Sequence, residues 1–212
     1  LGFAVAHILD NRVHDPEHLT QAVKDLAQQI AGALSNARRP VVISGTSCGS
    51  DQVVKAAANI TWALHARNKE TGIVFTLPEC NSMGLAAMKG KRLASAIDAV
   101  RNGKADTVII LENDLYRRNE TSVVNNFFKT CKHIIVLDHS NTATAEQADV
   151  LIPTGAFAES DGILVSSEGR AQRYFQVFET PDVIQESWRW ILTFGVAAEN
   201  DKMSKWKNFD DL

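Results

Sequence analysis

Short apolar runs alternate along the chain with longer amphipathic stretches. The apolar runs are rich in β-branched residues and predict strands at residues 41–43, 73–75, 107–111, 134–137 and 150–152. Between these runs, apolar residues recur every three or four positions, which predicts helices that each bury one face. Unalternating strands separated by helices are typical of a parallel sheet that is covered on both faces. The pattern therefore predicts an α/β fold with a doubly wound, mostly parallel sheet and helices on both faces.

Capping signals predict where several of the helices begin and end. The Asp-Pro-Glu sequence at residues 15–17 combines a capping carboxylate, a proline suited to the first turn and an acid near the positive helix end. This helix should end near Asn36, because Pro40 biases its predecessor away from the helical region. The Thr-Pro-Asp sequence at residues 180–182 predicts the start of a last helix in the same way.

The pattern changes after the last predicted parallel strand. Apolar runs at residues 163–165 and 174–177 flank a polar turn, which predicts an added hairpin or an irregular ribbon before the final helix. We expect residues 1–14 to form an N-terminal extension and residues 199–212 a C-terminal tail. Because no linker, repeat or low-complexity segment interrupts the chain, residues 1–212 are predicted to form a single α/β domain.

Composition and charge exclude several classes of protein. The chain has 212 residues, of which 45% are hydrophobic and 22% charged, as in a globular protein with a core and unlike a disordered chain or a disulfide scaffold. Lys and Arg number 22 against 25 Asp and Glu, which disfavours a nucleic-acid partner. No apolar run approaches the roughly 18–20 residues of a membrane span, so we expect no direct membrane insertion. The chain begins with Leu1 and shows no signal-peptide pattern, and we expect a piece of a longer polypeptide.

Cysteine and histidine usage predicts no metal site. The three cysteines, Cys48, Cys80 and Cys131, lie far apart, whereas an iron–sulfur cluster takes about four thiolates. Such sparse cysteines indicate a reducing compartment and buried free thiols. The histidines show no metal-ligand spacing. Because Cys48 lies in a glycine loop before a helix, a stand-alone hydrolase with Cys48 as its nucleophile is a further hypothesis.

The glycine loop at residues 45–50 is one candidate binding element. It joins the first predicted strand to a helix, where backbone N–H groups and the helix end can hold an anion. Its spacing matches neither the phosphate-binding loop of nucleotide hydrolases nor the dinucleotide-binding loop. The alternative is that Gly45 and Gly49 only permit a tight turn.

Polar residues at predicted strand ends are the other candidates, because ligands of an open parallel sheet bind at the carboxyl ends of its strands. Glu112 and Asn113 follow the third predicted strand and Asp138 ends the fourth. Asn113 and Asp138 have side chains that can hydrogen-bond a nucleotide base or ribose. The alternative is that they form local turns and caps.

The order of the polar motifs resembles a signature of the molybdopterin oxidoreductase superfamily, and the likeness extends from Val41 to Val196. Within that superfamily, the loop at residues 44–51 and the segment 81–85 are most similar to the G-chain family of bacterial NADH:quinone oxidoreductase, respiratory complex I. The signature segments are TATAEQADVLIP at residues 142–153, ESDG at 159–162, SEGRAQ at 167–172 and NSMG at 81–84.

This resemblance implies part of a peripheral-arm subunit on the cytoplasmic face of the bacterial inner membrane. Iron–sulfur clusters upstream in the parent chain would carry the electrons, and the partners would be other domains of that chain and other peripheral-arm subunits. In catalytic relatives the strand ends help to hold the guanosine part of the cofactor, which makes Gly45, Glu112, Asn113 and Asp138 vestigial cofactor-facing positions.

The sequence departs from the catalytic relatives at two places. Leu111 stands where they carry glycine, and the side chain would crowd a nucleotide. Residues 78–81 contain an acid and no arginine where a pyrophosphate needs neutralising. We therefore expect a structural fragment with no catalytic residue and no cofactor. The alternative is the nucleotide-binding domain of an active molybdopterin oxidoreductase that resembles formate dehydrogenase and holds molybdopterin guanine dinucleotide.

An inner domain of this kind would expose apolar surface that its neighbours normally cover. The aromatic residues of the C-terminal tail, Trp206 and Phe209, are the candidates for that surface.

Overall fold

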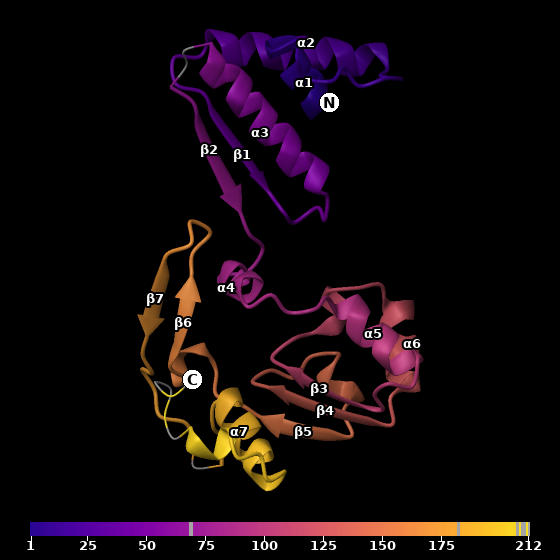
Figure 1. Ribbon diagram of the computed structural model, residues 1–212, viewed down its shortest axis with the longest axis vertical. Helices are drawn as coiled ribbons and strands as arrows, with labels where there is room; N and C mark the ends of the chain where they lie inside the picture. Colours follow the sequence, from indigo (N-terminus) through magenta and orange to yellow (C-terminus); the bar gives the residue numbers. More distant parts are fainter. Residues whose placement is uncertain (68–69, 182, 207, 209–210, 212) are drawn as a thin grey trace. The chain divides into compact units, whose positions relative to one another are not determined.

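The computed structural model describes residues 1–67, 70–181, 183–206, 208 and 211. Their contacts divide the chain into two compact units. Unit 1 comprises residues 1–87 and 165–170, and unit 2 comprises residues 88–164 and 171–212. Parallel sheets flanked by helices and a C-terminal helix confirm the predicted α/β class (Figure 1). The single folding domain stays a prediction.

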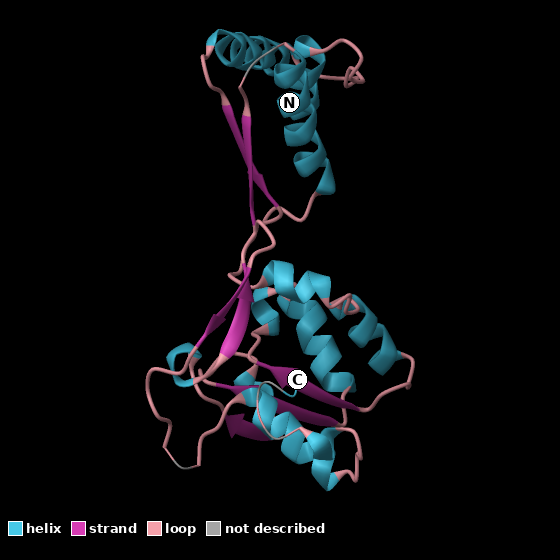
Figure 2. Cartoon of the chain, turned by 60° about the vertical axis from the view of Figure 1, so that its left-hand side comes forward, coloured by secondary structure: helices cyan, strands magenta, loops and turns pink. Residues whose placement is uncertain are grey.

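Unit 1 contains a two-stranded parallel sheet with helices packed on one side (Figure 2). Val42 packs against a core in which alanines let the helices approach closely, whereas Val41 and Ile43 point to the opposite face and are exposed. The elements are α1 (Gly2–Leu9), α2 (Gln21–Asn36), β1 (Val41–Gly45), α3 (Asp51–Ala66), β2 (Gly72–Thr76) and α4 (Ser82–Ala87). The core residues are Ala4, Val5, Leu9, Ala27, Ala31, Ala63 and Leu64.

The predicted start of α2 was wrong by several residues. The helix begins at Gln21, with Thr20 as its cap, and not at residues 15–17. His18 has a φ of 59°, a left-handed conformation that a right-handed helix cannot contain, so the Asp-Pro-Glu sequence lies in the preceding turn. The predicted extension, residues 1–14, contains α1, whose Val5 is buried in the core of unit 1.

Unit 2 contains a three-stranded parallel sheet with the order β3-β4-β5. Its main elements are α5 (Leu93–Arg101), β3 (Thr107–Leu111), α6 (Thr121–Thr130), β4 (His133–Asp138), β5 (Val150–Pro153), β6 (Gly162–Val165), β7 (Ala171–Tyr174) and α7 (Ser187–Ala197). Short 3-10 helices are η1 (Leu115–Arg117), η2 (Ala145–Gln147), η3 (Phe157–Glu159) and η4 (Met203–Lys205). Helices α5 and α6 pack on the sheet through Ile97, Val124 and Phe127. Strands β6 and β7 pair as the predicted hairpin, but the second strand covers Ala171–Tyr174 and not the apolar run at residues 174–177.

The last helix also begins later than predicted. Helix α7 starts at Ser187, because the preceding segment is engaged in other bonds. Thr180 Oγ1 donates to the Ile184 carbonyl (2.8 Å), and Ile184 N donates to the Pro181 carbonyl (2.8 Å). Gln185 then pairs as an isolated parallel bridge with Thr154. Ile184 is therefore bonded back to Thr180 and Pro181 ahead of the helix, and Asp182 lies outside the described residues.

The C-terminal tail departs from its prediction too. Trp206 follows η4 and is half-buried, so it is not the exposed aromatic surface that we expected. Phe209 lies outside the described residues.

Within the part of the chain that the structure describes, none of the helices combines the length and the apolar character needed to cross a bilayer.

Candidate functional site

Three of the four candidate residues lie at one edge of the sheet in unit 2. Glu112 and Asn113 follow β3, and Asp138 ends the neighbouring strand β4. Parallel pairing of β3 with β4 brings these strand ends together. The fourth candidate, Gly45, ends β1 in unit 1. A role of these four residues in binding stays a prediction, and its chemistry depends on which of their polar atoms already have partners.

The turn after β3 uses its polar groups internally. Glu112 has a φ of 47°, and its N–H donates to the Leu137 carbonyl (2.7 Å). A left-handed residue other than glycine costs roughly 1–2 kcal/mol, so this turn is held by its surroundings. Asn113 Oδ1 accepts a hydrogen bond from Arg118 Nε (3.0 Å). The amide oxygen that was a candidate for a base or ribose therefore faces a guanidinium of its own loop.

Asp114, next in sequence, is fixed by a buried threonine. Its Oδ1 accepts from Thr144 Oγ1 (2.8 Å) and from Tyr116 N (3.2 Å). Thr144 is completely buried, and the same hydroxyl accepts from Leu115 N (2.8 Å). This link ties the loop after β3 to the loop after β4. Sequence reasoning missed Thr144, although it lies in the signature segment 142–153.

Asp138 forms the local turn that was the alternative interpretation. Its side chain is buried, and Oδ1 accepts from Ser140 N (3.0 Å) and lies 3.6 Å from His139 Nδ1. Its carbonyl accepts from Thr154 N (3.1 Å). Thr154 Oγ1 is enclosed and has no hydrogen-bond partner among the described residues. Because this hydroxyl is shielded from solvent, it does not present a contact to a ligand.

The close approach of β2 explains why residue 45 is a glycine. A Cβ at this position would lie 2.6 Å from the Thr76 carbonyl oxygen and would also strike Thr76 Oγ1. Thr46 N donates to the same carbonyl (3.3 Å), and Thr76 Oγ1 donates to the Ser44 carbonyl (3.2 Å). Glycine is therefore required where the two strands end.

A cavity of about 370 Å³ lies beside the glycine loop in unit 1. The residues that line it are Thr46, Gly49, Ser50, Asp51, Val54 and Lys55. Gly49 has a φ of 65°, which matches the tight-turn interpretation. Asp51 Oδ2 accepts from Lys55 Nζ (2.7 Å), and this bond lowers the pKa of the Asp51 carboxyl. A carboxylate at the first residue of α3 opposes an anion there, so the cavity is poorly suited to phosphate.

The cysteines differ from the buried free thiols that we predicted. Cys48 and Cys80 are exposed, and Cys131 is half-buried, with Sγ donating to the Phe127 carbonyl (3.3 Å). Burial, and then the charge of Asp149, raise the pKa of the Cys131 thiol. Among the described residues, no group of three or more His, Cys, Asp or Glu is placed to hold a metal ion.

The Cys131 thiol should therefore react more slowly than the thiols of Cys48 and Cys80. At pH 8, alkylation of Cys131 by iodoacetamide is expected to be at least tenfold slower than that of Cys48 or Cys80, because a raised pKa leaves less thiolate and packing limits access. Peptide-resolved mass spectrometry measures all three rates in one sample, and the rate at Cys131 should still be rising steeply at pH 9. Equal rates in the folded chain would contradict this assignment, and equal rates in urea serve as the control.

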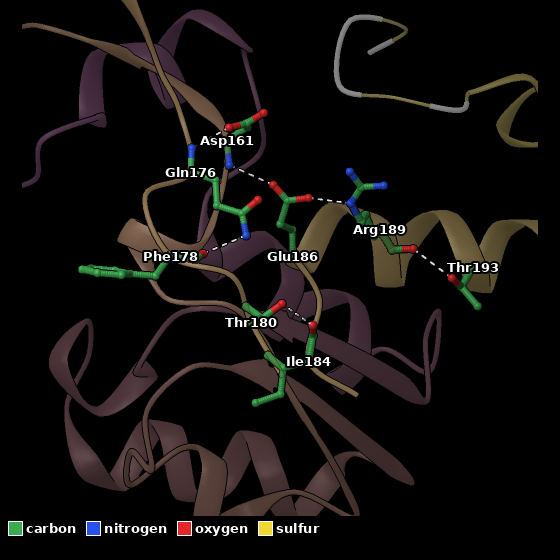
Figure 3. Close-up of polar contacts among 8 residues, drawn as sticks. All are labelled: Asp161, Gln176, Phe178, Thr180, Ile184, Glu186, Arg189 and Thr193. Atoms are coloured by element: carbon green, nitrogen blue, oxygen red, sulfur yellow. Dashed lines mark hydrogen bonds and ion pairs between the residues drawn. The ribbon is translucent and has the colours of Figure 1, made fainter. Parts of the chain in front are cut away.

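A polar network that the sequence did not reveal joins α7 to the hairpin (Figure 3). Glu186 is 9% exposed and precedes α7. Its Oε1 accepts from Asp161 N (2.8 Å), and its Oε2 accepts from Arg189 Nε (2.6 Å). Asp161 Oδ1 in turn accepts from Gln176 N (2.7 Å). We call Asp161, Gln176, Glu186 and Arg189 the clamp, because they bind the chain before β6, the chain after β7 and the start of α7 together.

The motif at residues 159–162 also has a structural role. Glu159 Oε2 accepts from Ala156 N (2.8 Å), and Asp161 belongs to the clamp. Gly162 lies against Tyr174, whose ring stacks on Phe157 with a centroid distance of 4.5 Å. The motif therefore shapes the chain around the hairpin, and its carboxylates are used for this purpose.

Asn81 lies in residues 78–81, which the resemblance likened to a pyrophosphate-binding stretch, and its side-chain oxygen also has a partner within the protein. Its Oδ1 accepts from Val165 N (2.8 Å) within unit 1. A Cβ at Gly84 would strike the Asn81 amide and lie 3.1 Å from Val165 Cγ2. Asn81 and Gly84 thus allow the segment around α4 to pack closely against the end of β6.

Comparisons with known proteins agree with the motifs. The sequence profile of the molybdopterin oxidoreductase family matches residues 5–193. The chain is similar to the G subunit of the NADH-quinone oxidoreductase of Pseudomonas fluorescens, at 45% identity over 90% of this chain and 22% of the relative. The corresponding protein of Pseudomonas putida is 43% identical, and that of Salmonella typhimurium 38%, each over 100% of this chain and 24% of the relative. The chain thus spans about a quarter of the length of these relatives.

Proposed function

The chain belongs to the molybdopterin oxidoreductase family, and from this premise we propose that it is a structural, non-catalytic part of a peripheral-arm subunit of an NADH:quinone oxidoreductase. Membership confirms the resemblance read from the signature segments. The parent polypeptide would be the G subunit of such a complex, on the cytoplasmic face of the bacterial inner membrane. Electrons would pass through iron–sulfur clusters elsewhere in that polypeptide, and the partners of these residues would be its other domains and other peripheral-arm subunits.

One observation carries the structural role. Three side chains at the carboxyl edge of β3-β4-β5 already accept hydrogen bonds from the protein itself through one oxygen each. Asn113 is engaged by Arg118, Asp114 by Thr144 and Asp138 by the backbone of Ser140. A guanosine that used the same acceptor positions would compete with these donors, and at the part-buried Asp114 and Asp138 a lost partner costs roughly 1–3 kcal/mol.

The charged side chains of unit 1 also support a structural role. In the loop cavity the one cationic side chain among the lining residues, Lys55, is paired with the Asp51 carboxylate (2.7 Å), and residues 78–81 carry Glu79 and no arginine. A pyrophosphate needs cationic side chains or unopposed backbone N–H groups. The residues present therefore do not fit molybdopterin guanine dinucleotide, and we derive no reaction step through it. These residues can hold strand ends and loops in fixed positions.

The test uses the full-length parent protein and the assembled complex. Acid hydrolysis of the purified parent protein, followed by chromatography, is expected to release no stoichiometric guanosine monophosphate or pterin. In the assembled complex, Asn113→Ala is expected to leave the rate of quinone reduction by NADH, per complex, within about twofold of wild type. The exposed variant Glu146→Gln is the matched control.

The alternative function, nucleotide binding in an active molybdopterin oxidoreductase, makes the opposite prediction. It would be supported by one guanosine monophosphate per parent chain, lost on Asn113→Ala. It would also be supported by a tenfold fall in turnover for Asn113→Ala in complexes that still assemble normally. Either result would overturn the structural role.

A further inference from the structure

The segment that follows β7 exposes large apolar side chains within four consecutive residues of unit 2. Phe175, Val177 and Phe178 are 65%, 72% and 62% exposed. Gln176 between them is exposed as well. We call residues 175–178 the apolar strip. Single exposed apolar residues are common, but a cluster of this kind marks an interaction surface.

The backbone of the apolar strip is held in place by hydrogen bonds. Gln176 N donates to Asp161 Oδ1 (2.7 Å), while Val177 N and Phe178 N both donate to the Ala158 carbonyl (2.8 and 3.0 Å). Gln176 Nε2 also donates to the Phe178 carbonyl (2.8 Å). The strip is therefore ordered before any partner binds, and little conformational entropy remains to be lost on docking.

The polar side of the strip is anchored to the clamp. Asp161 receives the Gln176 N–H and gives its own N–H to the buried Glu186. In Figure 3 the Phe178 ring points away from this network. Backbone N–H groups of the strip are thus satisfied on the inside while Phe178 points outward. Phe175 is exposed as well, with the Arg173 guanidinium 5.1 Å from the centre of its ring. This arrangement suits a surface that is completed by another apolar element.

The size of the strip indicates what kind of partner covers it. Two phenylalanines and a valine exposed to this extent present roughly 300–400 Å². A symmetric pair of strips would bury about 600–800 Å² in total, below the roughly 1,000 Å² that a specific interface between separate molecules needs. A tethered segment needs less area, because the chain connection gives it an effective concentration in the millimolar range. The curated relatives are about four times as long as this chain.

We propose that the apolar strip is a docking surface for an apolar segment of the parent polypeptide that lies outside residues 1–212. This inference rests on the proposed membership of a longer peripheral-arm polypeptide, but it is independent of the absence of a cofactor. The contact is intramolecular and forms in the parent polypeptide before the complex assembles.

The experiment measures accessibility in the full-length parent protein. Val177→Cys reports on the strip, and Ser122→Cys, an exposed position on α6, is the matched control. Peptide-resolved labelling with a maleimide is expected to be at least tenfold slower at Cys-substituted position 177 than at position 122 in the isolated, monomeric parent protein. A benzophenone attached at position 177 should cross-link to a peptide of the same chain outside residues 1–212.

Each other outcome would overturn the proposal. Equal labelling at both positions in the parent protein and in the complex would mean that the strip stays open. Protection that appears only in the assembled complex would assign the strip to another polypeptide of the complex. Protection that depends on protein concentration, with cross-links between two copies, would assign it to self-association. None of these measurements involves guanosine monophosphate or turnover. A failure of the docking proposal can therefore be distinguished from a failure of the proposed structural role.

Discussion

Replacing Glu186 by alanine is expected to lower the free energy of unfolding of unit 2 by about 2–4 kcal/mol. The carboxylate is almost fully buried and accepts two hydrogen bonds, one from Asp161 N and one from Arg189 Nε. Alanine would leave the half-buried Asp161 N–H without its acceptor. The Arg189 side chain is about half exposed, so solvent screens its part of the loss.

Urea unfolding and amide hydrogen exchange measure this effect together. Exchange at Asp161 and along β6 should accelerate in Glu186→Ala, because the clamp fixes the chain at these residues. Glu186→Gln keeps an acceptor for Asp161 N and loses the charge, so it should cost about half as much. The exposed Glu146→Gln is the control, with an expected change within about 0.5 kcal/mol. A Glu186→Ala chain as stable as this control would mean that the clamp does not stabilise unit 2.

The clamp also connects stability to the proposed docking surface. Asp161 links the buried carboxylate of Glu186 to the backbone of Gln176 within the apolar strip. Loss of Glu186 should therefore loosen the strip as well as the start of α7. This explains why a carboxylate is buried at a point with no evident chemistry: it fixes irregular chain segments that no sheet or helix holds.

The strands were largely predictable because their signal is local. Residues 107–111 coincide with β3, and the other parallel strands differ from their apolar runs by a few terminal residues. The helix starts were less predictable. An Asp-Pro-Glu or Thr-Pro-Asp sequence can open a helix or lie in a turn. After residues 15–17 the left-handed His18 excludes the helix, and Ile184 is bonded back to Thr180 and Pro181. Helix α1 was missed because its residues are mostly apolar and show little periodicity, as expected of a buried helix.

The sequence predicted where the candidate residues lie but not which groups their side chains bond. Parallel pairing placed Glu112, Asn113 and Asp138 at one edge, as the topology of an open sheet requires. Which donors reach those oxygens depends on contacts between distant residues. Thr144 lies 30 positions from Asp114, and Glu186 lies 25 positions from Asp161. No local pattern specifies such pairs, so the sequence left the choice between a ligand and a turn open.

Gly45 offers the sharpest test of that choice. Gly45→Ala is expected to destabilise the pairing of β1 with β2 by about 1–3 kcal/mol, as overpacking usually does. The added Cβ would lie 2.6 Å from the Thr76 carbonyl, a backbone atom that no side-chain rotation can move. Exchange of the β1 and β2 amides should accelerate accordingly. Gly32→Ala, in the interior of α2 with open space around the new Cβ, is the control and should stabilise the chain by about 0.5–1 kcal/mol.

The two interpretations of the glycine loop diverge in this experiment. If Gly45 is needed by the strands, Gly45→Ala loses stability, and Thr76→Ala restores only part of it because the carbonyl remains in place. If Gly45 instead admits the backbone close to a nucleotide, the variant keeps its stability while the parent protein loses bound guanosine monophosphate. Stable β1 and β2 amides in Gly45→Ala would therefore count against the structural explanation, because only the clash with Thr76 predicts their loss of protection.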